Sequence, residues 1–225
     1  MNFIVNKGFI LFLILGFFAC STPEKDAASR DQEAKENSSK GVVKNDFSNS
    51  NEDTVSQKEI PNFESELDFA TFIATSIEQR DYSQWDQITE KEVLFSPYAY
   101  INTGNANSLS VEELNNPTNE NKFWGIYDGR GDRILLSTQE YLKRFVYGVQ
   151  LSGDSVQITV FDGHLTTRGN TLQTIQKTYP SSVYVKFFNP ASSKNGMDWK
   201  ALILVVSKNE DSYVLEAIIH NQWTV

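Results

Sequence analysis

The sequence predicts an α+β fold for residues 61–225, with helices first and most of the strands after them. Apolar residues recur at helical spacing early in this segment and alternate with polar residues at strand spacing in its last third. In addition, 22 of the 28 aromatic residues lie here, which indicates that this segment holds the hydrophobic core. A segment of this length is sufficient for one domain.

Three helices are expected in this segment. Ser65 is followed three positions later by an acidic residue, which is typical of a helix start, and the apolar helical spacing continues to about Arg80. A short second helix is expected from Ser83. Ser137 and Glu140 have the spacing of a capping box, which predicts a third helix after them.

The strands are expected at residues 93–101, 156–160, 183–188, 201–206 and 213–223. Pro97 indicates an edge strand or a bulge in the first of them. Residues 201–206 are apolar at both parities, so both sheet faces would be covered, one by helices and the other, as one alternative, by a second copy in a homodimer. On the last strand, odd positions from Tyr213 form an apolar face, while Glu216 and His220 share the other face.

The element order is helix, short helix, strand, helix and then antiparallel strands. This order resembles that of the NTF2-like fold, and the resemblance rests on it alone. It implies a cone in which a curved sheet wraps around helices and a pocket. Another two-layer α+β sandwich is the alternative.

The start of the chain is typical of an export signal. One lysine precedes an apolar run at residues 8–18, which is shorter than the ~20 residues that a bilayer-spanning helix needs. Ala19 and Cys20 follow the run directly, and this arrangement resembles a bacterial lipoprotein signal. The resemblance implies cleavage before Cys20, lipidation of its thiol, and palmitate among the acyl chains that bind the membrane.

Three regions follow from these patterns: a signal peptide at residues 1–19, a lipidated Cys20 with a disordered tether at residues 20–60, and the α+β domain. The tether has few large apolar residues, so it cannot bury enough surface to offset the entropy lost on ordering. The expected location is extracytoplasmic in a bacterial cell envelope, anchored by lipid, with the outer membrane favoured.

Composition excludes several classes of function. The chain has 20 Lys and Arg against 29 Asp and Glu, a formal net charge of −9, which argues against nucleic acid as a partner. Cys20 is the single cysteine, so no intrachain disulfide can form. Only His164 and His220 could add nitrogen ligands, too few for a zinc site. We therefore expect no metal and no cofactor.

Four short segments with rare residues resemble an extracytoplasmic domain of bacterial envelope proteins for which the resemblance implies no activity. They are residues 95–98, 124–129, 198–199 and 220–224. Aromatic rings with polar tips in and near them either line a ligand cleft or pack at the rim of the core. The candidate pocket residues are Tyr98, Tyr100, Trp124, Tyr127, Asp128, His220 and Trp223.

Two weak catalytic candidates remain. Glu216 and His220 would act as a proton-transfer pair or as a hydrogen-bonded surface pair. Asp128, which precedes Gly129, would be a turn residue or a general base. The main hypothesis is a non-catalytic module that binds a small ligand or another envelope component. The alternative is an isomerase- or hydratase-like enzyme that uses His220 or Asp128.

Overall fold

The structure is a computed structural model that describes residues 59–101, 106–162, 173–209 and 212–223. The predicted signal at 1–19, the lipidation site Cys20, nearly all of the predicted tether, and His164 lie outside the described residues. Among the described helices, none has the length and apolar character needed to cross a bilayer.

Helices and strands are mixed along the domain, which confirms the α+β class. The first half contains α1 (Glu66–Gln79), a 3₁₀ turn (Trp85–Gln87), β1 (Glu92–Ser96), β2 (Asn107–Ser110), α2 (Val111–Asn115), β3 (Asn121–Ile126) and β4 (Arg133–Ser137). The second half contains α3 (Thr138–Tyr141), a π turn (Leu142–Val146), β5 (Gln157–Asp162), α4 (Gln173–Thr178), β6 (Val183–Asn189), β7 (Lys200–Asn209) and β8 (Ser212–Gln222).

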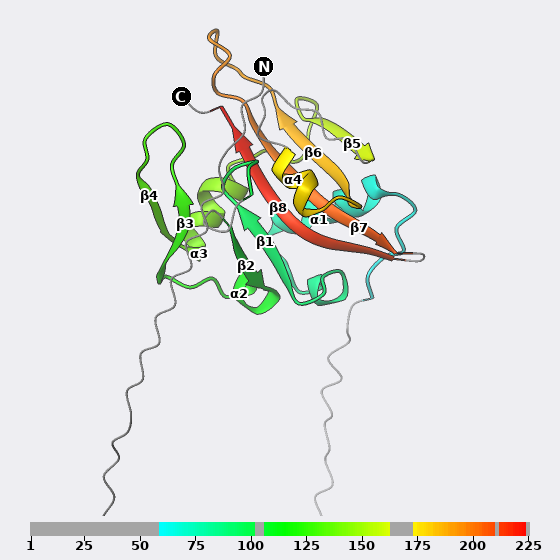
Figure 1. Ribbon diagram of the computed structural model, residues 1–225. Helices are drawn as coiled ribbons and strands as arrows, with labels where there is room; N and C mark the ends of the chain where they lie inside the picture. Colours follow the sequence, from blue (N-terminus) through cyan, green and yellow to red (C-terminus); the bar gives the residue numbers. More distant parts are fainter. Residues whose placement is uncertain (1–58, 102–105, 163–172, 210–211, 224–225) are drawn as a thin grey trace, which may run out of the picture. The chain divides into compact units, whose positions relative to one another are not determined.

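Six strands form one curved sheet in the order β2-β1-β8-β7-β6-β5, and β3 and β4 form a separate hairpin beside it (Figure 1). All neighbours in the large sheet are antiparallel except β1 and β8, which are parallel. The prediction that Pro97 marks an edge strand or a bulge is wrong. Strand β1 lies between β2 and β8 and ends at Ser96. Pro97 therefore lies outside the ladder of hydrogen bonds, and its lack of a backbone N–H does not interrupt the sheet.

The sheet buries apolar side chains on both faces. The main core lies on the face covered by α1 and α3 and includes Phe69, Phe145 and Leu202. The small cluster lies on the opposite face, under α4 (Figure 1). Its buried members are Ala99, Ile175, Tyr184, Ile203, Val205, Ala217 and Ile219. Residues of this same chain therefore cover the second face of β7, for which the sequence had suggested a second copy.

A β-bulge in β8 changes which side chains face which core. Val205 pairs with Ala217, whereas the next residue, Val206, pairs with Leu215, so Glu216 is the extra residue. Leu215 faces the main core, but Ala217 faces the small cluster. The prediction that the odd positions of this strand share one face is therefore wrong, because one inserted residue reverses the alternation.

Local capping begins two of the helices as predicted. The Ser65 Oγ accepts a hydrogen bond from the Asp68 N–H at 3.1 Å. At α3, the Ser137 Oγ accepts from the Glu140 N–H at 3.2 Å, and the Glu140 carboxylate accepts from the Ser137 N–H at 2.9 Å. The predicted third helix keeps α-helical geometry for only four residues and continues as the π turn.

Replacing Ser137 by alanine tests the capping box. We expect Ser137→Ala to lower the free energy of unfolding by about 1 kcal/mol, because the Glu140 N–H loses its acceptor and the Glu140 carboxylate loses the hydrogen bond from the Ser137 hydroxyl. Urea denaturation of the full-length chain measures the loss. Ser155→Ala is the control, since its exposed Oγ makes one long hydrogen bond of 3.4 Å. Equal stability of the two variants would contradict the expectation.

Candidate functional site

Six of the seven candidate pocket residues lie close together around Phe145 of the π turn, and we call this group, with Tyr141 and Phe145, the aromatic cluster. Its candidate members are Tyr98, Tyr100, Trp124, Tyr127, Asp128 and His220. The seventh, Trp223, follows the end of β8, is 36% exposed, and donates its backbone N–H to the Trp199 carbonyl at 3.4 Å.

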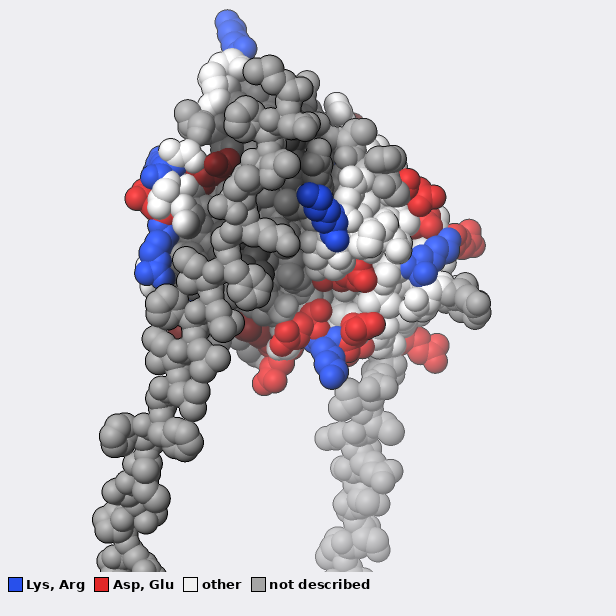
Figure 2. Space-filling model, viewed as in Figure 1, with Lys and Arg blue, Asp and Glu red and all other residues white. Residues whose placement is uncertain are grey.

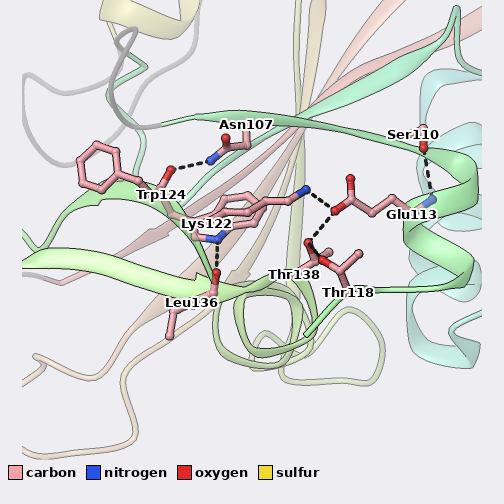
Figure 3. Close-up of polar contacts among 9 residues, drawn as sticks. Asn107, Ser110, Glu113, Thr118, Lys122, Trp124, Leu136 and Thr138 are labelled. Carbon is pink, nitrogen blue, oxygen red and sulfur yellow. Dashed lines mark hydrogen bonds and ion pairs between the residues drawn. The ribbon is translucent and has the colours of Figure 1, made fainter. Parts of the chain in front are cut away.

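The β3–β4 hairpin carries Trp124 and is held beside the sheet by a small polar network (Figure 3). Glu113 of α2 forms an ion pair with Lys122 of β3 and accepts a hydrogen bond from the Thr138 hydroxyl of α3 at 2.7 Å. The Asn107 amide of β2 donates to the Phe123 carbonyl at 2.9 Å. These contacts tie the hairpin to the edge of the large sheet.

Trp124 belongs to the core rather than to an open cleft. Its ring is fully buried and stacks on Tyr141, with centroids 3.7 Å apart and planes 13° apart. Its indole N–H donates to the Leu136 carbonyl of β4 at 2.9 Å, so the polar tip is satisfied within the hairpin. Trp124 therefore packs in the core and does not line a ligand cleft.

Tyr98, Tyr100 and Asp128 meet where the hairpin turn approaches the end of β1. The Tyr98 and Tyr100 rings stack with centroids 5.5 Å apart, and the Tyr98 hydroxyl accepts the Asp128 backbone N–H at 3.3 Å. Burial, followed by the charge of Asp128, raises the pKa of Tyr100 to about 12. Asp128 itself lies in the exposed β3–β4 turn, beside Gly129 at φ +78°.

His220 is buried and neutral. Its Nδ1 lies 2.9 Å from the Pro97 carbonyl, which can only accept, so Nδ1 carries the proton and Nε2 carries the lone pair. Nε2 has no hydrogen-bond partner among the described residues. The pKa of His220 is lowered to about 4, chiefly by burial and also by the charges of Lys200 and Arg144, against the opposing effect of the Pro97 carbonyl. To act as a general base at neutral pH, His220 would have to become positively charged while buried among apolar groups.

Glu216 and His220 do not share a face of β8, which corrects the predicted pair. The Phe145 ring contacts His220 on the main-core face, at 5.2 Å between centroids. Glu216 accepts a hydrogen bond from the Ser182 hydroxyl at 2.6 Å, and its charge helps to raise the pKa of Tyr184 in the small cluster. The bulge at Glu216 causes this separation.

A groove that sequence analysis missed lies on the other side of the π turn. Two cavities of about 260 and 180 Å³ share Arg80 and Tyr147 in their linings, and we call the pair the Arg80 groove. The larger is also lined by Ile77, Glu78, Val149, Gln150 and Leu151. The smaller is also lined by Tyr82, Leu114, Asn115, Pro117, Gln139 and Leu142. The one local signal was a helix that ends at an arginine, where glycine is usual.

Charges of both signs are distributed over the face drawn in Figure 2, where Lys and Arg are scattered and acidic side chains gather along the edge near α2 and the start of β1. In the part of the chain that the structure describes, no group of three or more His, Cys, Asp or Glu residues is placed to hold a metal ion.

The buried His220 predicts a specific dependence of stability on pH. The folded pKa of about 4 lies below the unfolded value of about 6.5, so the unfolded chain binds more protons between these values. The stabilisation is complete above pH 6.5 and declines as the pH falls towards 4, by at most about 3 kcal/mol. Urea denaturation from pH 7.5 to 4 measures it.

The difference in stability between wild type and His220→Asn should therefore shrink as the pH falls, because the contributions of other groups cancel in the comparison. His164→Asn is the matched control, since the chain has only these two histidines. A difference between wild type and His220→Asn that stays constant over this range would refute the neutral, buried state of His220.

Comparison with known proteins identifies no relative of this chain. No protein-family model, curated protein or solved structure matches the chain. The functional proposal therefore rests on the groove and on the chemistry of its lining.

Proposed function

We propose that this chain is a lipid-anchored protein of the bacterial cell envelope whose α+β domain binds a small ligand without transforming it. The observation that carries the proposal is the Arg80 groove, whose lining combines one cation, one carboxylate, two tyrosines and three side-chain amides with apolar side chains. A concave surface on which several polar groups converge among apolar side chains can fix the orientation of a small ligand.

An acid–base enzyme has less support. His220 faces the core and donates its Nδ1–H to the Pro97 carbonyl, and accepting a second proton at Nε2 would charge a buried ring. Asp128 lies in an exposed hairpin turn, where water can compete with any substrate. For the fold, the finer proposal is an NTF2-like cone. It is supported by the single curved sheet with α1 and α3 against one face.

Anchoring is proposed from the sequence around Cys20. A lipid on this thiol would also explain why an exported chain carries one cysteine, since a free exposed thiol is prone to oxidation. Because the chain carries a net negative charge, anionic lipid head groups would repel the domain. A tether of about forty residues, with a root-mean-square span of roughly 35 Å, would hold the domain away from them.

A ligand screen tests the binding function. Cell-wall fragments, sugars and lipids are added to the full-length chain in detergent, and the melting temperature is measured. A ligand at 100 times its Kd should stabilise the domain by about 2.7 kcal/mol, a rise of several degrees.

Asn115→Trp should abolish this rise, because the exposed Asn115 lines the smaller cavity and an indole there would fill it. The neighbouring exposed Asn116→Trp is the control, since Asn116 is outside the lining. A screen in which no compound raises the melting temperature would refute the binding function.

Cys20→Ala tests the anchor independently. Loss of the thiol should abolish partitioning into detergent and remove the acyl mass from the N-terminal peptide, because the lipid has no other cysteine to attach to. The circular dichroism spectrum and melting temperature should match those of the wild type. Membrane partitioning of the variant to the wild-type extent would contradict the lipoprotein assignment.

A further inference from the structure

Arg80 adopts a backbone conformation that glycine would adopt more easily. It caps α1 in the left-handed region, at φ 57° and ψ 35°, and its N–H donates to the Ile77 carbonyl at 3.2 Å. It is the single residue other than glycine with a positive φ in the described part of the chain. Glycine is the usual residue at this position because it has no Cβ to clash. Arg80 therefore carries backbone strain that glycine would avoid, and strained residues of this kind often lie at functional sites.

The guanidinium of Arg80 is held over the groove without an acidic partner. It lies 4.8 Å from the centre of the Tyr147 ring, in a cation–π contact. The ion pairs between described residues are Lys122–Glu113 and Lys208–Glu66, so neither includes this charge. Glu78, which also lines the larger cavity, accepts a hydrogen bond from the Ser152 hydroxyl at 2.8 Å.

Tyr147 is held in place from two sides. The Tyr147 N–H donates to the Leu142 carbonyl at 2.8 Å, the five-residue spacing of a π turn. The extra residue rotates the following positions by about 100° relative to an α-helix, so the turn determines where the Tyr147 ring points. At its other end, the Tyr147 hydroxyl lies 2.8 Å from the Tyr82 hydroxyl. Two departures from regular helix geometry thus meet at one groove.

The smaller cavity has the lining of a site for a small, polar anion. Arg80 is the one charged residue in its lining, and the amides of Asn115 and Gln139 supply donors and acceptors. A third cavity, of about 290 Å³ beside Phe63 and Tyr213, has no charged residue in its lining. At about 180 Å³ the smaller cavity is below the ~300 Å³ at which sites for drug-sized ligands begin, so it suits a single ring.

We propose that this cavity binds a carboxylated, hydroxyl-bearing ligand of monosaccharide size, such as a uronic acid. The Arg80 guanidinium binds the carboxylate, whose planar geometry it matches, and the two amides bind hydroxyl groups. Pro117 and the Tyr147 ring, which are half-buried members of the lining, contact the C–H surface of the sugar ring. This inference rests on the proposed binding function and specifies its site and ligand chemistry.

Isothermal titration calorimetry of the full-length chain in detergent, with D-glucuronate and D-glucose as probes, tests the inference. These two sugars differ only in the carboxylate. We expect wild type to bind glucuronate at least tenfold more tightly than glucose, and Arg80→Gln to lose at least tenfold in glucuronate affinity. Arg130→Gln, in the exposed β3–β4 turn, is the matched control and should bind like wild type.

Arg80→Gly separates binding from folding. Glycine relieves the left-handed backbone strain, so the melting temperature should equal or exceed that of wild type while glucuronate binding is lost. Equal affinity for both sugars, or wild-type glucuronate affinity in either Arg80 variant, overturns the inference. If neither sugar binds but another compound gives a thermal shift sensitive to Asn115→Trp, the carboxylate proposal fails and the binding function stands. If no compound binds, both fail.

Discussion

Burial of β7 on both faces is the constraint on which the rest of the domain depends. Its residues alternate between two cores: Leu202, Leu204 and Val206 face the main core, while Ile203 and Val205 face the small cluster. Both faces must therefore be covered for the strand to be stable in water. Helices α1 and α3 cover one face, and α4 with the segment after β1 covers the other (Figure 1).

The β3–β4 hairpin depends on a few polar contacts as well as on Trp124. Glu113 connects three elements, because it pairs with Lys122 of β3 and with Thr138 of α3 while it belongs to α2. Its side chain is 20% exposed and that of Lys122 is 33% exposed, so removing either partner would leave a charge incompletely solvated. The hairpin in turn brings Tyr127 under the guanidinium of Arg144, at 4.9 Å. The π turn is thus packed on one side against the aromatic cluster and borders the Arg80 groove on the other.

The end of α1 and the π turn combine two backbone geometries that lower stability. An αL arginine and a π turn both cost conformational free energy relative to glycine and a regular α-helix. In many proteins such local departures occur at binding sites, where the surrounding structure stabilises them. Here the main core supplies that stabilisation, since Ile77 and Leu142 are buried next to Arg80 and Tyr147. The strained lining therefore lowers the stability of the domain, and packing in the main core offsets that loss.

The sequence alone determined the features that depend on neighbours along the chain. Caps at Ser65 and Ser137 form from residues three positions apart, and the strands predicted at 183–188, 201–206 and 213–223 are present as β6, β7 and β8. The sequence also predicted that several tyrosines and tryptophans would line a cleft or pack at the rim of the core, because their rings are apolar and their tips polar.

Only the tertiary structure decided the features that depend on register and on distant contacts. One bulged residue placed Glu216 and His220 on opposite faces, and no local pattern marks that residue, because bulges arise from how two strands pair. The Arg80 groove likewise depends on distant contacts, and its one signal in the sequence was a predicted helix end at an arginine. Arg80 and Tyr147 are brought together by the packing of α1 against the π turn, and helical periodicity assumes 3.6 residues per turn, so it cannot anticipate a π turn.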